Sequence, residues 1–306
     1  MKGRDLLSID DLAPEELRSL LADARAVKSD PASFGDRLHG ARVALIFEKP
    51  STRTRVSFES AVVSMGGHAI VLRGDELQLG RGETIEDTGK VLSRYVDAIV
   101  IRTFGQDRLE ALAQAAEVPV VNALSDQEHP CQALADLQTI IEHRGDPAGK
   151  VITYIGDGNN VAHSLMLGGV MLGAHVRVAT PAEYEPVETV VMRCEQIARG
   201  TGGSIEVTHD PHRAADGATV LYTDVWASMG QEAEAEEKKK VFTDYRIDSA
   251  ILARAASDAI VLHCLPAHRG EEISAEVIDG PQSVVWDEAE NRMHAQKALL
   301  AQILAD

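Results

Sequence analysis

Eight short strand-like runs, separated by helix-length intervals, are the feature that most limits what this chain can fold into. They lie at residues 43–47, 69–72, 98–101, 118–121, 151–155, 176–178, 219–222 and 259–262. Between them apolar residues recur at helical spacing, and the first helix is predicted roughly from Asp11 to Lys28. Strands that alternate with helices indicate parallel β-α-β units. We therefore predict an α/β fold of two domains, each a parallel sheet flanked by helices, joined by interdomain helices.

A Gly/Pro-containing stretch divides the two series of strands. The segment from His143 to Gly149 interrupts the helical pattern and is typical of a linker. A chain of 306 residues also suggests two domains at roughly 150 residues each. We predict domains at residues 1–142 and 143–288, with a C-terminal helix at about 289–306 that packs back on the first domain.

The charge balance restricts the partners of this chain. It has 30 Lys plus Arg against 48 Asp plus Glu, a formal net charge of −18. Such a protein repels nucleic acid and anionic membrane surfaces, and no apolar run approaches the roughly 20 residues that span a bilayer. We predict no nucleic-acid partner and no membrane partner, and an anionic ligand would need a local basic site.

The cysteines and the N-terminus indicate the compartment. Three cysteines, Cys131, Cys194 and Cys264, are too few and odd in number for a disulfide framework. The N-terminus becomes acidic at Asp5, whereas signal peptides need an apolar stretch and transit peptides avoid acids. We expect a cytoplasmic protein.

Polar residues gather where the predicted strands end, which is where ligands bind to open α/β sheets. The first strand is followed by Ser51-Thr52-Arg53-Thr54-Arg55, with Ser51 as the predicted N-cap of the next helix. A helix N-terminus with hydroxyl and guanidinium groups suits a phosphate, because both its N–H groups and arginine donate to anionic oxygens. A capped helix with solvated arginines is the alternative interpretation.

Later strand ends carry similar polar groups. They are Arg102, His129-Pro130-Cys131-Gln132, the run from Gly156 to Asn160, the run from Asp224 to Gly230, and His263-Cys264-Leu265-Pro266, while Arg292 lies at the start of the last helix. Each residue alone has a structural explanation, such as a helix cap or a core histidine. Their recurrence at the same ends of the predicted sheets favours a binding or catalytic site.

Three other functions are less well supported by the residues. Gly156-Asp157-Gly158 resembles a dinucleotide fingerprint, but Val161 replaces its third glycine and no ribose-binding acid follows the next strand. A zinc site of His129, Cys131, His263 and Cys264 is disfavoured, because neighbours on a strand point to opposite faces. A cysteine hydrolase needs a histidine-activated thiol, a geometry that the sequence does not establish.

The run from Glu232 to Lys240 is the one compositionally biased segment. Its pairs Glu234/Lys238 and Glu236/Lys240 have the i,i+4 spacing that stabilises a helix surface. We predict a solvated helix there.

Two of these motifs carry a family resemblance. The runs 51–55 and 129–132 resemble the carbamoyl phosphate signatures of the aspartate/ornithine carbamoyltransferase superfamily, and the match spans essentially the whole chain. The segments 224–232 and 263–266 are similar to its ornithine branch. The resemblance implies transfer of the carbamoyl group from carbamoyl phosphate to the δ-amino group of L-ornithine, with carbamoyl phosphate bound in the first domain and ornithine in the second.

The resemblance also implies the site residues. The implied catalytic residues are Arg102, His129 and Cys264. Those implied to bind carbamoyl phosphate are Ser51, Thr52, Arg53, Thr54, Gln78, Arg102, His129, Pro130, Cys131, Gln132, Cys264, Leu265 and Arg292. Those implied to bind ornithine are Asn160, Asp224, Ser228 and Met229. No metal and no organic cofactor are implied, and Gln78 is expected to reach a neighbouring subunit's site in a homotrimer or a multiple of trimers.

Two further functions stay open at this point. One is carbamoyl transfer to putrescine or to an N-acylated ornithine, although these lack the charged α-amine that Asp224 would bind. The other is a binding protein without turnover, which the presence of Arg102 and His129 argues against. The turn after the last strand also predicts a cis peptide bond between Leu265 and Pro266.

Overall fold

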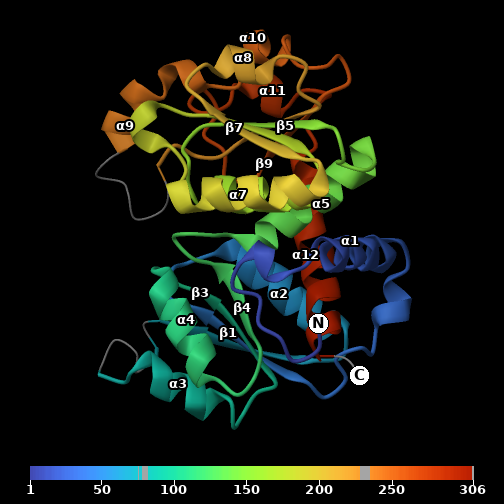
Figure 1. Ribbon diagram of the computed structural model, residues 1–306. Helices are drawn as coiled ribbons and strands as arrows, with labels where there is room; N and C mark the ends of the chain where they lie inside the picture. The colour runs from blue at the N-terminus through green and yellow to red at the C-terminus, as the bar shows by residue number, and fades with distance from the viewer. Residues whose placement is uncertain (75, 78–81, 228–234, 305–306) are drawn as a thin grey trace. The chain divides into compact units, whose positions relative to one another are not determined.

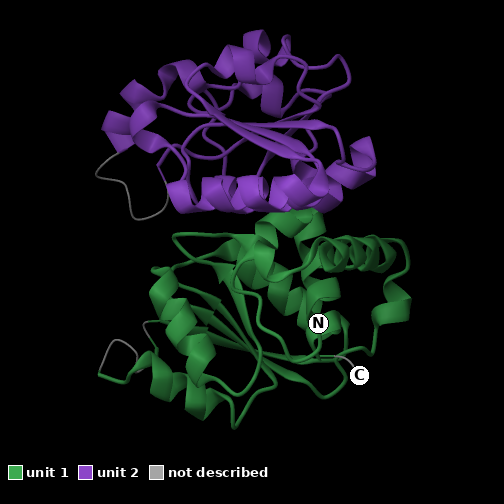
Figure 2. Cartoon of the chain, in the orientation of Figure 1, with its two compact units in different colours: residues 1–135, 290–306 green, residues 136–289 purple. Residues whose placement is uncertain are grey.

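The computed structural model describes residues 1–74, 76–77, 82–227 and 235–304, which form two compact units. Unit 1 contains residues 1–135 and 290–306, and unit 2 contains residues 136–289 (Figure 2). Each unit has one parallel β-sheet with helices on both faces (Figure 1). The predicted fold class is confirmed.

The sheet of unit 1 has the strand order β2-β1-β3-β4. Its strands are β1 (Arg42–Phe47), β2 (His68–Arg73), β3 (Ala98–Arg102) and β4 (Val120–Leu124). Its helices are α1 (Pro14–Ser29), α2 (Thr52–Ser64), α3 (Ile85–Leu92) and α4 (Gln106–Ala115). Helices α3 and α4 cover one face and α2 covers the other (Figure 1). The inner strands β1 and β3 are almost entirely apolar, as two-sided burial requires.

The sheet of unit 2 has the order β7-β6-β5-β8-β9. Its strands are β5 (Val151–Ile155), β6 (His175–Ala179), β7 (Ser204–Thr208), β8 (Val220–Thr223) and β9 (Ile260–His263). Its helices are α6 (Asn160–Met171), α7 (Glu188–Thr201), α8 (Pro211–Ala215), α9 (Ala235–Val241), α10 (Ser249–Leu252) and α11 (Ala275–Ile278). Helix α7 lies along one face of this sheet, and α8 and α10 lie over the other (Figure 1).

Two helices contribute residues to both units. They are α5 (Pro130–Arg144) and α12 (Val285–Leu304), and the division falls inside each of them, after Ala135 and after Ala289. The domain boundary predicted from the sequence, between residues 142 and 143, lies closer to the C-terminal end of α5 than the observed division. The Gly/Pro stretch marks the end of a helix, whereas the division depends on which side chains pack together.

All eight strand-like runs form strands, and β7 is the strand that the sequence analysis missed. Its pattern is weak because β7 is an edge strand with half-exposed residues, so Ile205 and Val207 alternate with polar neighbours. The first helix begins at Pro14, later than predicted, because Ile9–Asp11 forms a separate 3₁₀ turn. Further 3₁₀ turns lie at Pro31–Phe34, Ala182–Tyr184 and Thr243–Tyr245.

In both units the chain reverses its direction of winding beside a central strand. Strand β1 pairs with β2 on one side and β3 on the other, and β5 pairs with β6 and β8. The carboxyl ends at such a switch point are where open α/β sheets bind ligands. Within the described ranges, no helix combines the length and the apolar character needed to cross a membrane.

Candidate active site

The loop after β1 forms a cationic helix N-terminus in unit 1. Ser51 is the N-cap of α2, as predicted, and its hydroxyl accepts a hydrogen bond from the Thr54 backbone N–H at 3.3 Å. Arg102 ends β3 next to β1, and its Nη1 donates to Ser51 Oγ at 3.3 Å. Thr52 and Arg53 begin the helix and are exposed. The Ser51 hydroxyl, the Thr54 N–H and the Arg102 guanidinium therefore meet at the N-terminus of α2, an arrangement that can accommodate an anion.

Arg292 of α12 gathers three more of the predicted residues, which we call the Arg292 cluster. Its guanidinium donates to Thr54 Oγ1 at 2.9 Å, to Gln132 Oε1, and to His129 Nε2 at 3.3 Å. All four side chains are at most 4% exposed. A buried arginine that holds a hydroxyl, an amide and an imidazole makes a small polar surface suited to a planar, hydrogen-bonding group.

His129 is held in its neutral form. Burial lowers its pKa well below the usual 6.5, and the charges of Arg292, Arg102 and Arg53 lower it further. Because the Arg292 nitrogen can only donate, His129 Nε2 accepts this bond, which leaves the ring proton on Nδ1. The imidazole thus stays neutral among arginines and retains one N–H.

Pro130 and Cys131 begin α5 directly after His129. The Cys131 thiol is fully buried and donates to the Asn122 backbone carbonyl at 3.3 Å. Burial raises its pKa to about 12. A protonated, buried thiol is a poor nucleophile, so this geometry disfavours a hydrolase that uses Cys131.

An acidic residue beside the cationic loop was missed by the sequence analysis. Glu48 follows β1 directly, and both its carboxylate oxygens accept from Arg108 of α4 at 2.7–3.0 Å. Thr103 donates to the same carboxylate. No local sequence pattern indicates this ion pair, because Glu48 and Arg108 are 60 residues apart. Arg108 thereby neutralises an acid that would otherwise repel an anion.

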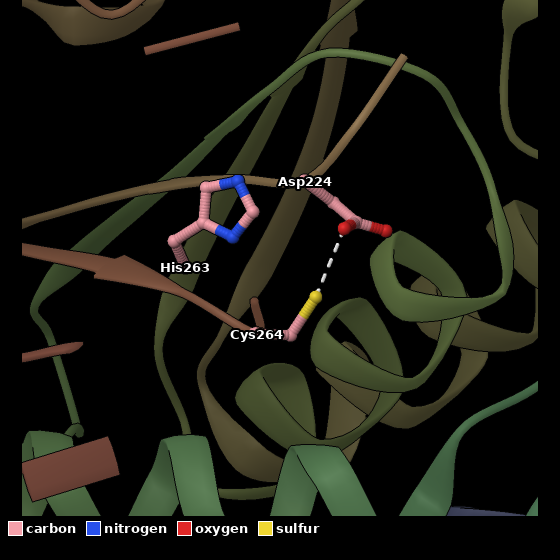
Figure 3. Close-up of side chains that lie close together, drawn as sticks. All are labelled: Asp224, His263 and Cys264. Carbon is pink, nitrogen blue, oxygen red and sulfur yellow. Dashed lines mark hydrogen bonds between the residues drawn. The ribbon is translucent and has the colours of Figure 1, made fainter. Parts of the chain in front are cut away.

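Asp224 is the centre of a second cluster, in unit 2, which we call the Asp224 cluster. Its Oδ1 accepts from the Cys264 thiol at 2.9 Å and from the Val225 N–H at 2.8 Å. Its Oδ2 accepts from Asn159 Nδ2 at 2.9 Å. Figure 3 shows the Asp224 and Cys264 side chains pointing toward each other. Adjacent strands β8 and β9 position the two residues.

The Cys264 thiol is protonated in this cluster. Burial raises its pKa well above the usual 9.0, and the neighbouring Asp224 carboxylate raises it further. At neutral pH the thiol therefore donates a hydrogen bond to Asp224. It is not ionised to the thiolate that a nucleophile requires.

Asn159 and the predicted ligand Asn160 have different positions. Asn159 is the N-cap of α6, and its Oδ1 accepts from the N–H groups of Val161 and Ala162. Asn160 is the first residue of that helix and is half-buried. The structure therefore adds Asn159 to the Asp224 cluster. The sequence signal was its position before a helix, where asparagine is a preferred cap.

The turn after β9 is held by the His263 ring. His263 Nδ1 accepts from the Leu265 N–H at 2.9 Å, and its Nε2 lies 3.1 Å from Glu272 Oε1. Leu265 has φ +58°, a left-handed conformation that is rare for leucine. The Leu265–Pro266 peptide bond is cis, which confirms the prediction.

The geometric argument against a metal at His263 and Cys264 was wrong. We expected opposite faces, yet donor atoms of Asp224, His263 and Cys264 lie within 4.8 Å of one another. Strand alternation fails because β9 ends at His263. Hydrogen bonds to Leu265 and Glu272 already engage the two ring nitrogens of His263.

Lys238 contradicts the prediction of a solvated helix over residues 232–240. It lies on α9 but is only 3% exposed, and its Nζ donates to Asp157 Oδ2 at 2.6 Å. The charge pattern indicated only neighbours of Lys238 on the same helix, whereas its buried partner Asp157 lies in a loop that is distant in the sequence. Glu234 lies outside the described residues, as do the predicted site residues Gln78, Ser228 and Met229.

Comparison with known sequences defines the class of protein. Residues 4–142 match the family model described as aspartate/ornithine carbamoyltransferase, carbamoyl-P binding domain. Residues 148–303 match the model described as aspartate/ornithine carbamoyltransferase, Asp/Orn binding domain. This chain belongs to the aspartate/ornithine carbamoyltransferase family.

Its similar relatives belong to the ornithine branch. An ornithine carbamoyltransferase of Parafrankia sp. (strain EAN1pec) is 59% identical, over 99% of this chain and 97% of the relative. A protein named ornithine carbamoyltransferase, anabolic, from Pyrococcus furiosus is 54% identical, over 99% and 97% of the two chains. The solved structure of ornithine carbamoyltransferase from Pyrococcus furiosus superposes with a TM-score of 0.96, at 54% identity, over 99% and 97% of the two chains.

Proposed function

We propose that this enzyme transfers the carbamoyl group of carbamoyl phosphate to the δ-amino group of L-ornithine, giving L-citrulline and phosphate, as in arginine biosynthesis. The observation that carries the choice of ornithine is the Asp224 cluster. A buried carboxylate beside a thiol attracts the α-ammonium of ornithine. It would repel the side-chain carboxylate of aspartate.

The cationic helix N-terminus suits the phosphate end of carbamoyl phosphate. Ser51, Thr52, Arg53 and Thr54 would bind the phosphate oxygens through hydroxyls, backbone N–H groups and a guanidinium, with help from Arg102. Pro130 and Cys131 would shape the site by starting α5 at this position. The Cys131 thiol contributes packing, since it is bonded to the Asn122 carbonyl.

The Arg292 cluster suits the carbamoyl end. Thr54, Arg102 and His129 would donate to the carbonyl oxygen, and Gln132 would accept from the carbamoyl nitrogen. The neutral δ-amine of ornithine attacks the carbamoyl carbon, and negative charge forms on that oxygen. Donors already aimed at the oxygen stabilise this charge without reorganisation. A neutral His129 supplies an N–H donor while Arg292 supplies the positive charge.

Collapse of the tetrahedral intermediate breaks the bond from carbon to the phosphate oxygen. The phosphate leaves with the electron pair and is stabilised by Arg53 and Arg102. The attacking nitrogen loses one proton and the leaving phosphate takes it up, so that the products are citrulline and HPO₄²⁻. No metal or organic cofactor is needed, because carbamoyl phosphate already carries an activated leaving group.

The unit 2 residues suit the amino acid. Asp224 and Ser228 would bind the α-ammonium, while Asn160 and the backbone at Met229 would bind the carboxylate. The Cys264 thiol and the Leu265 carbonyl would lie near the δ-amine. The His263 ring holds the turn that presents Leu265, because its hydrogen bond to the Leu265 N–H fixes the peptide plane between Cys264 and Leu265.

A single assay tests this function. Purified protein with carbamoyl phosphate and ornithine should form citrulline and phosphate in equal amounts. Aspartate, putrescine and N-acetylornithine serve as alternative acceptors. Faster carbamoylation of any of these three would assign a different acceptor, and binding of carbamoyl phosphate without turnover would assign a binding protein.

We also propose a homotrimer, or a multiple of trimers, in which Gln78 reaches the carbamoyl phosphate of a neighbouring subunit. A heterologous ring places one subunit's loop at the next subunit's site. Gln78→Ala and Arg102→Ala subunits, dissociated together and reassembled, should then regain part of the wild-type activity. Confirmed mixing without recovery would place Gln78 in the site of its own subunit.

We further propose that the enzyme acts in the cytoplasm. Cys131 and Cys264 are buried thiols with assigned hydrogen-bond acceptors, and a reducing compartment preserves them in that form. Localisation of a tagged full-length chain tests this expectation.

A further inference from the structure

Lys238 and Asp157 form a buried ion pair next to the Asp224 cluster. The Lys238 side chain is 4% exposed, the Asp157 side chain is 12% exposed, and the Nζ–Oδ2 distance is 2.6 Å. The ammonium also lies 5.2 Å from the centre of the Tyr184 ring. Burying a lysine is costly unless its charge has a partner, so this position requires a specific explanation.

Asp157 and Asp224 occupy neighbouring strand ends. Tyr154 of β5 pairs in register with Tyr222 of β8, and the chain continues from them to Asp157 and Asp224. Burial raises the pKa of Tyr154 well above its usual range, and both carboxylates raise it further. The charges of Asp157 and Asp224 therefore both influence the buried Tyr154 side chain.

Asn159 connects the Asp224 carboxylate to the backbone of Asp157. Its backbone N–H donates to the Asp157 carbonyl at 2.7 Å, while its Nδ2 donates to Asp224 Oδ2 at 2.9 Å. The turn that carries Asp157 is tightly held, since the Gly158 N–H donates to the Tyr184 carbonyl at 2.9 Å. A Cβ at Gly158 would lie 2.3 Å from the Pro186 nitrogen, so only glycine permits this approach. Asp157 thus has a fixed position relative to Asp224.

The charges at these strand ends discriminate between possible ligands. Two carboxylates and one ammonium leave a net charge of −1, whereas the two carboxylates alone would give −2. Ornithine with a neutral δ-amine is a zwitterion of zero net charge, with a carboxylate that an extra acid would repel. A diamine with one neutral amine is a cation, which an extra acid would attract. The ion pair therefore favours an amino acid over a simple amine.

We propose that Lys238 is a specificity-determining positioning residue: by neutralising Asp157, it leaves Asp224 as the single charged acid offered to the substrate and so selects α-amino acids over amines. This inference rests on the proposed function, because it concerns the same amine site. Lys238 acts through Asp157 and does not itself touch the substrate.

A matched pair of ligands tests the proposal directly. L-Norvaline has the α-ammonium and carboxylate of ornithine but no δ-amine, and butylamine is norvaline without the carboxylate. Their Kd values are measured by calorimetry on the full-length protein saturated with carbamoyl phosphate. In Lys238→Met, the ratio of the norvaline Kd to the butylamine Kd should rise at least tenfold. In Asp157→Asn, which leaves Lys238 unopposed, the ratio should fall.

Three further variants separate charge from structure. The double variant Lys238→Met/Asp157→Asn should return the ratio to within about threefold of wild type, and Lys238→Arg should preserve the ratio. Lys239→Met is the matched control, since Lys239 lies on the same helix but pairs with Glu236 and Glu271. The affinity for carbamoyl phosphate should not change in any variant.

The outcomes are distinct. A purely structural role predicts that both ligands weaken by the same factor, which would overturn the proposal. If Lys238→Met does not fold, the opposite shift in Asp157→Asn and the recovery in the double variant still decide the question. Citrulline formation by the wild type, measured separately, tests the proposed function alone, because the Kd ratio needs no turnover.

Discussion

The candidate site in unit 1 and the candidate site in unit 2 have similar strand-end architecture and opposite charge. In unit 1, Ser51 follows β1 and Arg102 ends β3, and Arg292 donates a hydrogen bond to Thr54 in the helix that Ser51 caps. In unit 2, the ends of β8 and β9 carry Asp224 and Cys264. The parallel sheet determines where a ligand binds, and the side chains at the strand ends determine its charge.

Each half also contains an acid that a distant cation neutralises. Glu48 follows β1 and pairs with Arg108, and Asp157 follows β5 and pairs with Lys238. Glu48 would repel a phosphate, and Asp157 would repel an amino-acid carboxylate. The comparison indicates that local charge is adjusted by partners that are far away in the sequence.

Asp224→Asn should have the largest effect. Asparagine lacks the charge, and its NH₂ group would face one of the donors that now point at the carboxylate. We expect a loss of about 4 kcal/mol, roughly a thousandfold, in kcat/KM for ornithine. The Kd for carbamoyl phosphate should be unchanged. Weaker binding of carbamoyl phosphate would contradict the division of roles between the two units.

Arg53→Ala should affect the candidate site in unit 1. It removes a charged hydrogen bond to the phosphate, at a cost on the order of 2–4 kcal/mol in transition-state stabilisation, or roughly thirtyfold to a thousandfold. Arg55→Ala is the matched control, because Arg55 lies on the same helix and faces Glu59 at 3.6 Å. Equal effects of the two variants in a phosphate-release assay would argue against a phosphate site at Arg53.

Arg108→Met sharpens the comparison of the neutralised acids. It leaves Glu48 as an unpaired negative charge, so the KM for carbamoyl phosphate should rise roughly tenfold, about 1.4 kcal/mol. The double variant Arg108→Met/Glu48→Gln should recover most of this loss. If the double variant is no better than the single one, Arg108 acts through packing and not through charge.

The pH dependence of stability should show the smallest effect. The unfolded chain protonates His129 below about pH 6.5, but the lowered pKa keeps His129 neutral in the folded state. This contribution to stability is therefore fully present above pH 6.5 and is lost as the pH falls toward the folded-state pKa, by up to about 1.4 kcal/mol per pH unit. The free energy of unfolding is measured with urea at several pH values between pH 7 and pH 5. It should fall less steeply with decreasing pH in His129→Asn than in the wild type. An equal pH dependence of the unfolding free energy in the variant and the wild type would mean that His129 is protonated in the folded protein.

Local sequence patterns predicted the described strands other than the edge strand β7, together with the N-cap at Ser51 and the candidate residues at the strand ends. These features depend on neighbours within a few positions, such as the apolar residues of β1 or the hydroxyl before α2. The cis bond before Pro266 was predicted for the same reason, since it belongs to a proline turn.

Long-range partners were not predictable in this way. The i,i+4 charges around Lys238 indicated a solvated helix, yet its partner Asp157 lies 81 residues away. Arg108 likewise lies 60 residues from Glu48. Nothing within either helix distinguishes a lysine or arginine that faces water from one that faces a buried acid.

The sequence by itself determined the α/β fold class, the family and the kind of chemistry at each strand end, because periodicity and motifs are local. Only the tertiary structure decided the state of those groups. It made His129 neutral, kept the Cys264 thiol protonated against Asp224, and buried Lys238 against Asp157. The physical reason is that burial and Coulomb interactions depend on distance in space, which the packing of remote segments sets.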